Sequence, residues 1–172
     1  MTSFHLELQA NTILKKMLVD RGYILEEDSK EDFTVKGTKD DKHKLISFIC
    51  NEDKLSIQGI KDYMSIMNKE GYNRCIIIYR DSVTSSAKKS LDNLDIELFS
   101  LQELQLDITE HRLVPKHERT TKEEKEDLEK SYKGRLPILL HTDPISRYYY
   151  FQRGDYIRIT RKDGSIMYRL VK

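Results

Sequence analysis

The sequence predicts an α/β protein of two domains, an N-terminal domain with a small, mostly parallel sheet and an α+β C-terminal domain. Between residues 44 and 100, short apolar stretches alternate with helical patterns, as in parallel strands joined by helices. One stretch, "CIIIY", is apolar throughout, which is typical of a strand covered on both faces. After residue 103 the chain changes to a charged helix and a pair of alternating strands. We therefore expect domains at 1–103 and 104–172.

The first predicted element is a helix, "FHLELQANTILKKMLVDRG", at residues 4–22. Its apolar side chains recur with the i, i+3, i+4 spacing of one helix face, and they are Ile13, Leu14, Met17 and Leu18. Gly22 is a stop signal for this helix. Weak strands are expected next, at 23–25 and 33–37.

A central unit follows with three predicted strands, at 44–50, 75–79 and 96–100. A helix near 58–70 separates the first two strands and carries Ile60, Tyr63, Met64 and Met67 on one face. A shorter helix over 84–94 begins with Ser and Thr residues, which favour helix N-termini. Right-handed crossovers through these helices would make the three strands parallel.

The C-terminal part begins with residues 101–109, which predict one helical turn leading into a strand. Residues 111–119 are irregular around Pro115. The segment "TTKEEKEDLEKSYKG" then predicts a helix with a capping box between Thr121 and Glu124, ended by Gly134.

Three further elements complete the predicted chain. "RLPILL" is extended on both sides of Pro137, and Asp143 caps a helix that has Pro144 at its first position. Residues 155–161 alternate apolar and polar side chains, as a half-buried strand does. A "KDG" turn then returns the chain as the antiparallel partner, 166–172.

Charge is high and unevenly spread along the chain. Charged residues make up 34% of the sequence and hydrophobic residues 38%, a composition that suits a subunit of a larger assembly. Residues 1–103 carry 15 basic and 18 acidic side chains, whereas residues 131–172 carry 9 basic and 3 acidic. The basic C-terminal portion indicates an acidic partner surface, a nucleic acid, or a solvated basic face.

Membrane and secretory signals are not found in the sequence. No apolar run approaches the roughly 20 residues needed to cross a bilayer, and the N-terminus lacks the pattern of a signal peptide. Cys50 and Cys75 lie in apolar stretches with no C-x-x-C pairing. We therefore expect buried, reduced thiols in an intracellular protein.

The segment "HRLVPKH" (111–117) could be a metal site, a catalytic cluster or a rigid basic turn. Zinc sites use closely spaced ligand pairs, and His111 and His117 are too far apart for that spacing. No serine lies in a nucleophile elbow, and no glycine-rich phosphate loop is present. The residues thus predict neither a catalytic site nor a bound metal or cofactor.

A metal-dependent nuclease is the alternative enzyme class. Such enzymes hold Mg²⁺ between carboxylates beside a lysine, and "CNEDK" offers Glu52 and Lys54, with Asp32 upstream. In those sites the Glu and Lys lie within a strand, whereas here they follow Asn51 in a predicted turn. We favour a solvated turn.

A DNA-contact site has a clearer physical basis at "SVTSSAKK" (82–89). Hydroxyl groups at a helix N-terminus, together with its free N–H groups and dipole, favour a phosphate. The candidate residues are Thr84, Ser85, Ser86, Lys88 and Lys89. On these residues alone, an ordinary Ser/Thr cap followed by two exposed lysines is the simpler interpretation.

An interface is indicated at 143–161, where tyrosines and arginines gather. Both residue types are enriched at protein interfaces, since each buries a large area and keeps a polar tip. We expect Tyr148 to pack inward, while Arg147 and Arg153 reach a partner or brace the 111–117 segment.

The C-terminal third resembles the assembly domain of the fifth subunit shared by eukaryotic nuclear RNA polymerases, which has an archaeal relative without the N-terminal jaw. The matching motifs are H-x-L-V-P-K-H (His111, Leu113–His117), E-K-x-x-L (Glu124, Lys125, Leu128) with Tyr132, L-P (Leu136, Pro137), D-P-x-x-R-Y (Asp143, Pro144, Arg147, Tyr148), R-G (Arg153, Gly154), I-x-R (Ile159, Arg161) and Y-R (Tyr168, Arg169).

The N-terminal part resembles the jaw domain of the eukaryotic subunit more loosely. "DRGY", "SF", "IIIY" and "TSSA" fall in the family's order. Jaws of this family resemble nuclease folds without the active site. The chain departs from the family at Ser85, where proline is usual, at Ile138, where arginine is usual, and at Tyr150, where glycine is usual. These departures indicate a divergent member, of cellular or viral origin.

The resemblance implies a non-catalytic subunit of a DNA-dependent RNA polymerase. The C-terminal domain would dock on the largest subunit, and Leu113 and Val114 would anchor in a core. The N-terminal domain would form part of the jaw beside downstream duplex DNA, contacted without reading sequence. The implied interface residues are His111, Arg112, Lys116, His117, Arg147, Tyr149 and Arg153.

The same resemblance implies the surroundings of the protein. One copy would assemble with the largest and other polymerase subunits, away from membranes and without a cofactor or metal of its own. Its place would be the nucleus, or a cytoplasmic replication site or virion if a virus encodes it.

Overall fold

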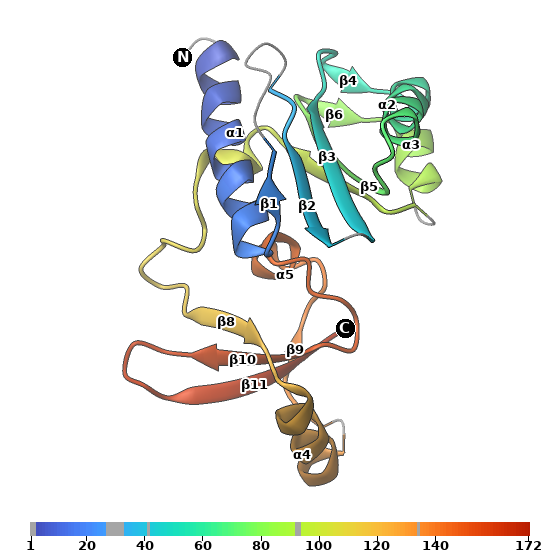
Figure 1. Ribbon diagram of the computed structural model, residues 1–172. Coiled ribbons are helices and arrows are strands. Elements are labelled where there is room, and N and C mark those ends of the chain that lie inside the picture. Colours follow the sequence, from blue (N-terminus) through green and yellow to red (C-terminus); the bar gives the residue numbers. More distant parts are fainter. Residues whose placement is uncertain (1–2, 27–32, 41, 92–93, 134) are drawn as a thin grey trace. The chain divides into compact units, whose positions relative to one another are not determined.

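The computed structural model describes residues 3–26, 33–40, 42–91, 94–133 and 135–172. The chain forms two compact units, Met1–Leu106 and Asp107–Lys172, which are called unit 1 and unit 2 below (Figure 1). Each unit has its own sheet, so the chain is of mixed α/β type. No helix among the described residues is long and apolar enough to cross a membrane.

Unit 1 is built on a five-stranded sheet in the order β1-β2-β3-β5-β7. The strands are β1 (Ile24–Leu25), β2 (Lys36–Asp40), β3 (His43–Ile49), β5 (Arg74–Tyr79) and β7 (Ile96–Ser100). β3, β5 and β7 are parallel, which confirms the predicted α/β unit. β1 and β2 extend the sheet with antiparallel pairing. β2 begins three residues later than the predicted strand at 33–37.

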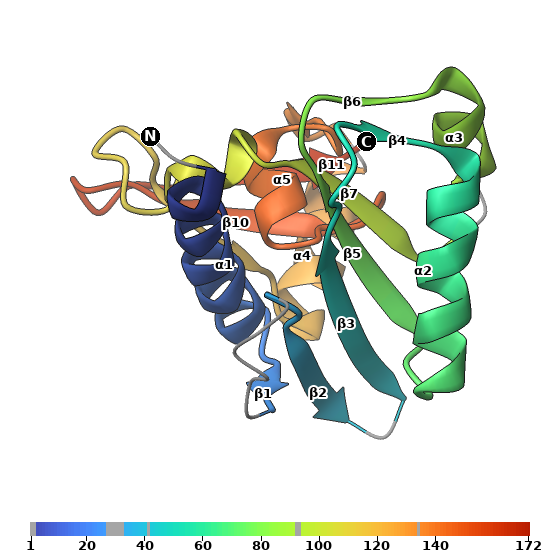
Figure 2. The same cartoon turned by 90° about the horizontal axis from the view of Figure 1, so that it is seen from above.

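Helices cover both faces of this sheet. α1 (Ser3–Asp20) lies on one side, and α2 (Ile57–Lys69) and α3 (Ser85–Ser90) lie on the other (Figure 2). Because successive side chains of a strand point to opposite faces, Ile46 and Phe48 pack into the cluster that includes Ile60 of α2. This is why the central strands read as continuous apolar runs.

The two cysteines lie in this core, as predicted. Cys50 and Cys75 are free thiols, and both are buried. Burial raises the pKa of the Cys75 thiol to about 12, with a smaller contribution from the nearby Glu97 carboxylate. The Cys75 thiol is therefore protonated at neutral pH.

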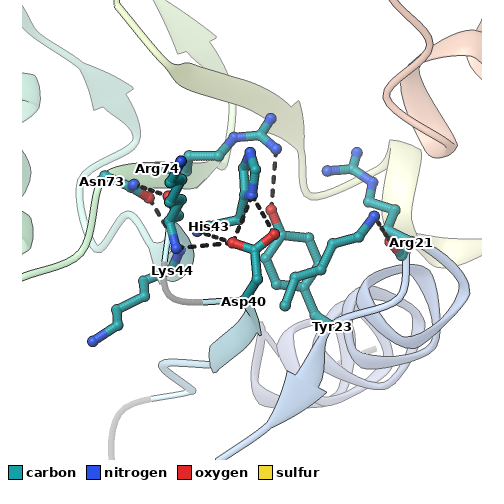
Figure 3. A network of polar contacts seen from close by, with 9 residues as sticks. Arg21, Tyr23, Asp40, His43, Lys44, Asn73 and Arg74 are labelled. Carbon is teal, nitrogen blue, oxygen red and sulfur yellow. Dashed lines mark hydrogen bonds and ion pairs between the residues drawn. The ribbon is translucent and has the colours of Figure 1, made fainter.

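Charged and polar side chains attach the segment after α1 to the sheet, and Figure 3 shows Arg21, Tyr23 and Arg74 among them. The guanidinium of Arg21 donates two hydrogen bonds of 2.8 Å to the carboxylate of Glu97 on β7. Arg74 lies 3.5 Å from the same carboxylate and donates to the Tyr23 hydroxyl at 3.0 Å. Lys39 of β2 donates to the Arg21 carbonyl. These contacts join α1, β2, β5 and β7 at one side of the sheet.

Short elements complete unit 1. β4 (Lys54–Leu55) and β6 (Ser82–Val83) form a parallel pair of their own, which follows the carboxyl ends of β3 and β5. The 3₁₀ turn η1 (Glu103–Gln105) confirms the predicted helical turn after β7. The strand expected to follow it by residue 109 is wrong, because residues 106–115 form turns and irregular backbone.

Unit 2 has a four-stranded sheet in the order β8-β10-β11-β9. The strands are β8 (Lys116–Arg119), β9 (Ile138–Leu139), β10 (Tyr156–Thr160) and β11 (Ile166–Val171). β10 and β11 form the predicted antiparallel hairpin, and β11 also pairs in parallel with β9. The helices are α4 (Lys122–Tyr132) and α5 (Pro144–Tyr148).

Each face of this second sheet has its own core. Leu139, Ile157, Ile159 and Val171 form one face, with Ile145 of α5 packed against them. Tyr156 and Leu170 form the other, with Leu128 of α4. The capping box of α4 is present as predicted, since Thr121 and Glu124 exchange hydrogen bonds. α4 ends at Tyr132, and its C-cap residue Lys133 has a left-handed conformation; the predicted stop at Gly134 lies outside the described residues.

Candidate functional site

The 111–117 segment lies along one side of the unit 2 sheet and enters β8. Val114 donates a backbone hydrogen bond to the His111 carbonyl, and its side chain packs against the core that contains Ile157. Leu113 was expected to anchor beside it, and this was wrong, because its side chain is 74% exposed. One apolar side chain therefore fixes the turn, while Leu113 and its neighbours His111 and Arg112 face outward.

His117 lies inside the unit at the start of β8. Its Nδ1 is 2.8 Å from the carbonyl oxygen of Pro115, which can only accept, so Nδ1 carries the proton. Burial lowers the pKa of His117, although the hydrogen bond to Pro115 partly opposes this. His117 was expected to donate a hydrogen bond to a partner subunit. In the structure it is a neutral, internal histidine whose hydrogen bond to Pro115 shapes the turn.

The other predicted interface residues occupy different surroundings. Lys116 is exposed and pairs with Glu118 at 2.8 Å, and hydrogen bonds from Lys116 and Arg158 lower the pKa of Glu118. Arg153 is exposed beside Gly154. Arg147 and Tyr149 are half-buried, at α5 and at its C-terminal cap.

Aromatic packing surrounds α5. Tyr148 is buried, as predicted. The rings of Tyr148 and Tyr149 pack edge to face. The ring of Tyr149 also stacks on that of Phe151, with ring centroids 5.4 Å apart. The helix itself starts as expected, because the carboxylate of Asp143 accepts a hydrogen bond from the Ile145 amide.

Arg119 was missed by the sequence reasoning. Its guanidinium donates to Asp155 at 2.9 Å and to the Tyr150 carbonyl at 2.6 Å, and it lies 5.1 Å from the centroid of the Phe151 ring. Tyr150 has φ = 53°, a left-handed conformation that glycine adopts without strain. Arg119 thus joins β8 to the loop after α5, and no local pattern in the sequence marks this long-range contact.

The predicted DNA-contact residues surround α3. Thr84 caps the helix, because its hydroxyl accepts from the Ala87 amide at 3.2 Å. Ala87 is fully buried against the core, and this fixes the orientation of the short helix. The exposed residues of the set are Ser85, Ser86, Lys88 and Lys89. The β4–β6 pair places Lys54 opposite Ser82, next to the start of α3.

The nuclease alternative requires Glu52 and Lys54 to converge with another acidic residue. Both side chains are exposed, Glu52 in a bend and Lys54 at the start of β4. Asp32, the third candidate, lies outside the described residues. Within the part of the chain that the structure describes, no three His, Cys, Asp or Glu side chains are grouped to hold a metal ion.

Comparison with known proteins gives the family. The model of the RNA polymerase Rpb5 C-terminal domain matches residues 106–171, nearly all of unit 2. The chain is 34% identical to the DNA-directed RNA polymerases I, II and III subunit rpabc1 of Dictyostelium discoideum, with 95% of each protein covered. The chain belongs to the RPABC1 (Rpb5) family.

Other RPABC1 relatives align over both units. The subunit RPABC1 of Caenorhabditis elegans is 31% identical, with 93% of this chain and 92% of that protein covered. A putative DNA-directed RNA polymerase subunit of Invertebrate iridescent virus 6 is 28% identical, with 93% and 96% covered. RPABC1 membership thus extends to unit 1, beyond the C-terminal domain, and the resemblance seen in the sequence motifs is confirmed.

Proposed function

We propose that this chain is a non-catalytic subunit of a multisubunit DNA-dependent RNA polymerase. The observation that carries the proposal is the alignment of both units with subunits of RNA polymerases I, II and III. Unit 2 docks on the largest subunit, and unit 1 forms part of the jaw beside downstream DNA. One copy takes part in a hetero-oligomer.

Several features of unit 2 support a role in assembly. Its outward-facing residues include His111, Arg112, Lys116 and Arg153. Arg119 and the aromatic side chains around α5 hold the neighbouring loops in place. A basic surface on a rigid unit suits docking, since charge complementarity speeds association and selects the partner.

Unit 1 has a suitable surface for duplex DNA at α3. Ser85, Ser86, Lys88 and Lys89 are exposed there, after the carboxyl ends of the parallel strands. In open α/β sheets, that edge is where ligands bind. Hydroxyl and ammonium groups contact phosphates without reading bases, so the contact is sequence-independent.

Catalysis and its Mg²⁺ belong to other subunits in this proposal. The exposed side chains of Glu52 and Lys54, and the family to which the chain belongs, favour a polymerase subunit over a nuclease. The subunit works in the nucleus, or at a cytoplasmic replication site or in the virion if a virus encodes it, as the viral relative suggests.

Affinity purification of the tagged full-length chain from its own cells, followed by mass spectrometry, tests the proposal. We expect the largest polymerase subunit and its partners in near-equal amounts. Recovery of the chain without polymerase subunits would contradict the proposal. So would Mg²⁺-dependent DNA cleavage by the pure chain that is lost in Glu52→Gln.

A further inference from the structure

A groove of about 520 Å³ opens in unit 2 between the 111–117 segment, the β10–β11 hairpin and the start of α5. Its floor is apolar and is formed by Val114, Leu139, Ile145, Ile159 and Met167. This volume is within the usual range of binding pockets, roughly 300–1,000 Å³. Arg112 and His117, two of the expected interface residues, line this groove, but the sequence motifs did not indicate that their residues come together in one groove.

The strand register explains the composition of the groove. Ile159 pairs with Met167, and Ile157 pairs with Arg169. Directly paired residues of antiparallel strands have side chains on the same face of the sheet. Met167 and Arg169 therefore share the face of the Ile157 core, and the hairpin turn brings Arg161 and Lys162 to its border.

The border of the groove is strongly cationic. Arg112, Arg161, Lys162 and Arg169 line it, against the single carboxylate of Asp143. Asp143 already accepts a hydrogen bond from the Ile145 amide as the cap of α5. Among the described residues, no carboxylate lies within 4 Å of any of the four cations, although hydrogen bonds from Ser165 and, less strongly, the charge of Arg161 lower the pKa of the exposed Asp163. Their contacts are with other groups, since Arg161 lies 3.8 Å from the Met167 sulfur and Arg169 donates to the Ile138 carbonyl.

We propose that this groove binds an acidic peptide segment with an apolar anchor residue, supplied by the largest polymerase subunit. The inference rests on the proposed function and specifies the chemistry of the docking contact. Carboxylates of the segment pair with Arg112, Arg161 and Lys162, while the anchor side chain covers Met167 and Ile159. A peptide fits better than duplex DNA, because a Leu, Ile or Phe side chain can cover the apolar floor, whereas a duplex keeps its bases stacked inside and presents mainly charged phosphates to a protein.

His117 holds one side of the groove in place through a hydrogen bond within the 111–117 segment. It lines the groove and its Nδ1–H donates to the Pro115 carbonyl, which holds the turn that carries Arg112. Asp143 and Arg169 are the charged groups that influence its pKa, in opposite directions. His117 is thus a positioning residue, and the ion pairs with the segment belong to the exposed cations.

The test uses the tagged full-length chain with Arg161→Glu and Lys162→Glu combined. The matched control combines Lys122→Glu and Lys130→Glu, which remove the same charge from exposed positions on α4, over the other face of the sheet. We expect the groove variant to recover about tenfold less of the largest subunit, since border charges steer association and select the partner. The control should recover wild-type amounts. A milder variant combines Arg161→Gln and Lys162→Gln, which removes the two charges without reversing them. Thermal unfolding, measured for every variant, separates a loss of binding from a loss of folding.

A peptide array of the largest subunit gives the second measurement. The pure chain should bind short peptides in which Asp or Glu flanks Leu, Ile or Phe, and their alanine versions at the acidic positions should not bind. Normal recovery of polymerase by both groove variants would overturn the groove proposal and leave the proposed function standing. Loss of DNA retention with normal recovery would show a nucleic-acid site and also overturn it. Failure of the wild-type chain to recover polymerase would instead overturn the proposed function.

Discussion

Arg21 and Glu97 form an ion pair whose side chains are only 3% and 15% exposed. Glu97→Gln keeps the shape but removes the carboxylate charge that lies beside both Arg21 and Arg74. We expect unit 1 to lose about 3 kcal/mol of unfolding free energy, the usual result of breaking a buried pair. Glu70→Gln is the control, since its pair with Lys36 is more than one-third exposed and is worth less than about 1 kcal/mol. Urea unfolding measures both, and equal losses would contradict the argument.

Tyr150 has φ = 53°, where L-residues are strained and glycine is not. Tyr150→Gly and Tyr150→Ala lose the same side-chain contacts, so only the backbone strain distinguishes them. We therefore expect Tyr150→Gly to be more stable than Tyr150→Ala by about 1 kcal/mol. Tyr149 has φ = −88°, so the order should reverse there, with Ala more stable than Gly. Thermal unfolding of the four variants checks this, and the same order at both positions would contradict it. The departure from the family's usual glycine was visible in the sequence, but the backbone conformation was not.

The lowered pKa of His117 makes stability depend on pH. In the folded unit burial disfavours the charged form, so the unfolded chain binds a proton first as the pH falls below about 6.5. The contribution of neutral His117 to the unfolding free energy is therefore fully present above that pH. It is lost as the pH falls from there through the lower pKa of the folded state. His117→Asn keeps a donor for the Pro115 carbonyl and does not titrate. We expect the unfolding free energy of the wild type, relative to this variant, to fall between pH 7.5 and pH 5; a constant difference would contradict it.

α3 is a short helix whose exposed lysines stand after the carboxyl ends of the parallel strands. Lys88→Glu with Lys89→Glu should weaken downstream DNA retention by the assembled polymerase. The dependence of log affinity on log salt should fall by about 0.9 for each lost phosphate contact. Lys44→Glu with Lys69→Glu is the control, because these exposed residues begin β3 and end α2 at the opposite edge of the sheet. An unchanged salt slope in the α3 variant would count against DNA contact there.

Elements with a strong local pattern could be predicted from the sequence. The parallel strands at 75–79 and 96–100 and the capping box at Thr121 each depend on neighbouring residues, and the structure has them. The groove could not be predicted in this way. Met167 and Arg169 join it only through pairing with β10, and Leu113 points outward although it belongs to an apolar motif. Such features depend on register and packing, which a single local pattern does not specify.

Each of the two units has its own sheet and core clusters, which suggests that each can fold separately. We expect residues 107–172 alone to unfold cooperatively and to recover the largest polymerase subunit, while residues 1–106 alone do not. In the full chain, Arg147→Ala should weaken recovery of the largest subunit without unfolding unit 2. Recovery by the N-terminal fragment and not by the C-terminal one would reverse the assignment of roles. Circular dichroism of both fragments provides the folding control.

The position of β11 affects the order in which the units form during synthesis. β11 lies between β10 and β9, so the sheet of unit 2 cannot close until residues 166–171 have left the ribosome. Unit 1 is complete at residue 106 and can fold while the rest is being made, as N-terminal domains generally do. The groove also includes Met167 and Arg169. The groove therefore cannot form before β11 has left the ribosome, and in our proposal assembly through it follows the synthesis of this strand.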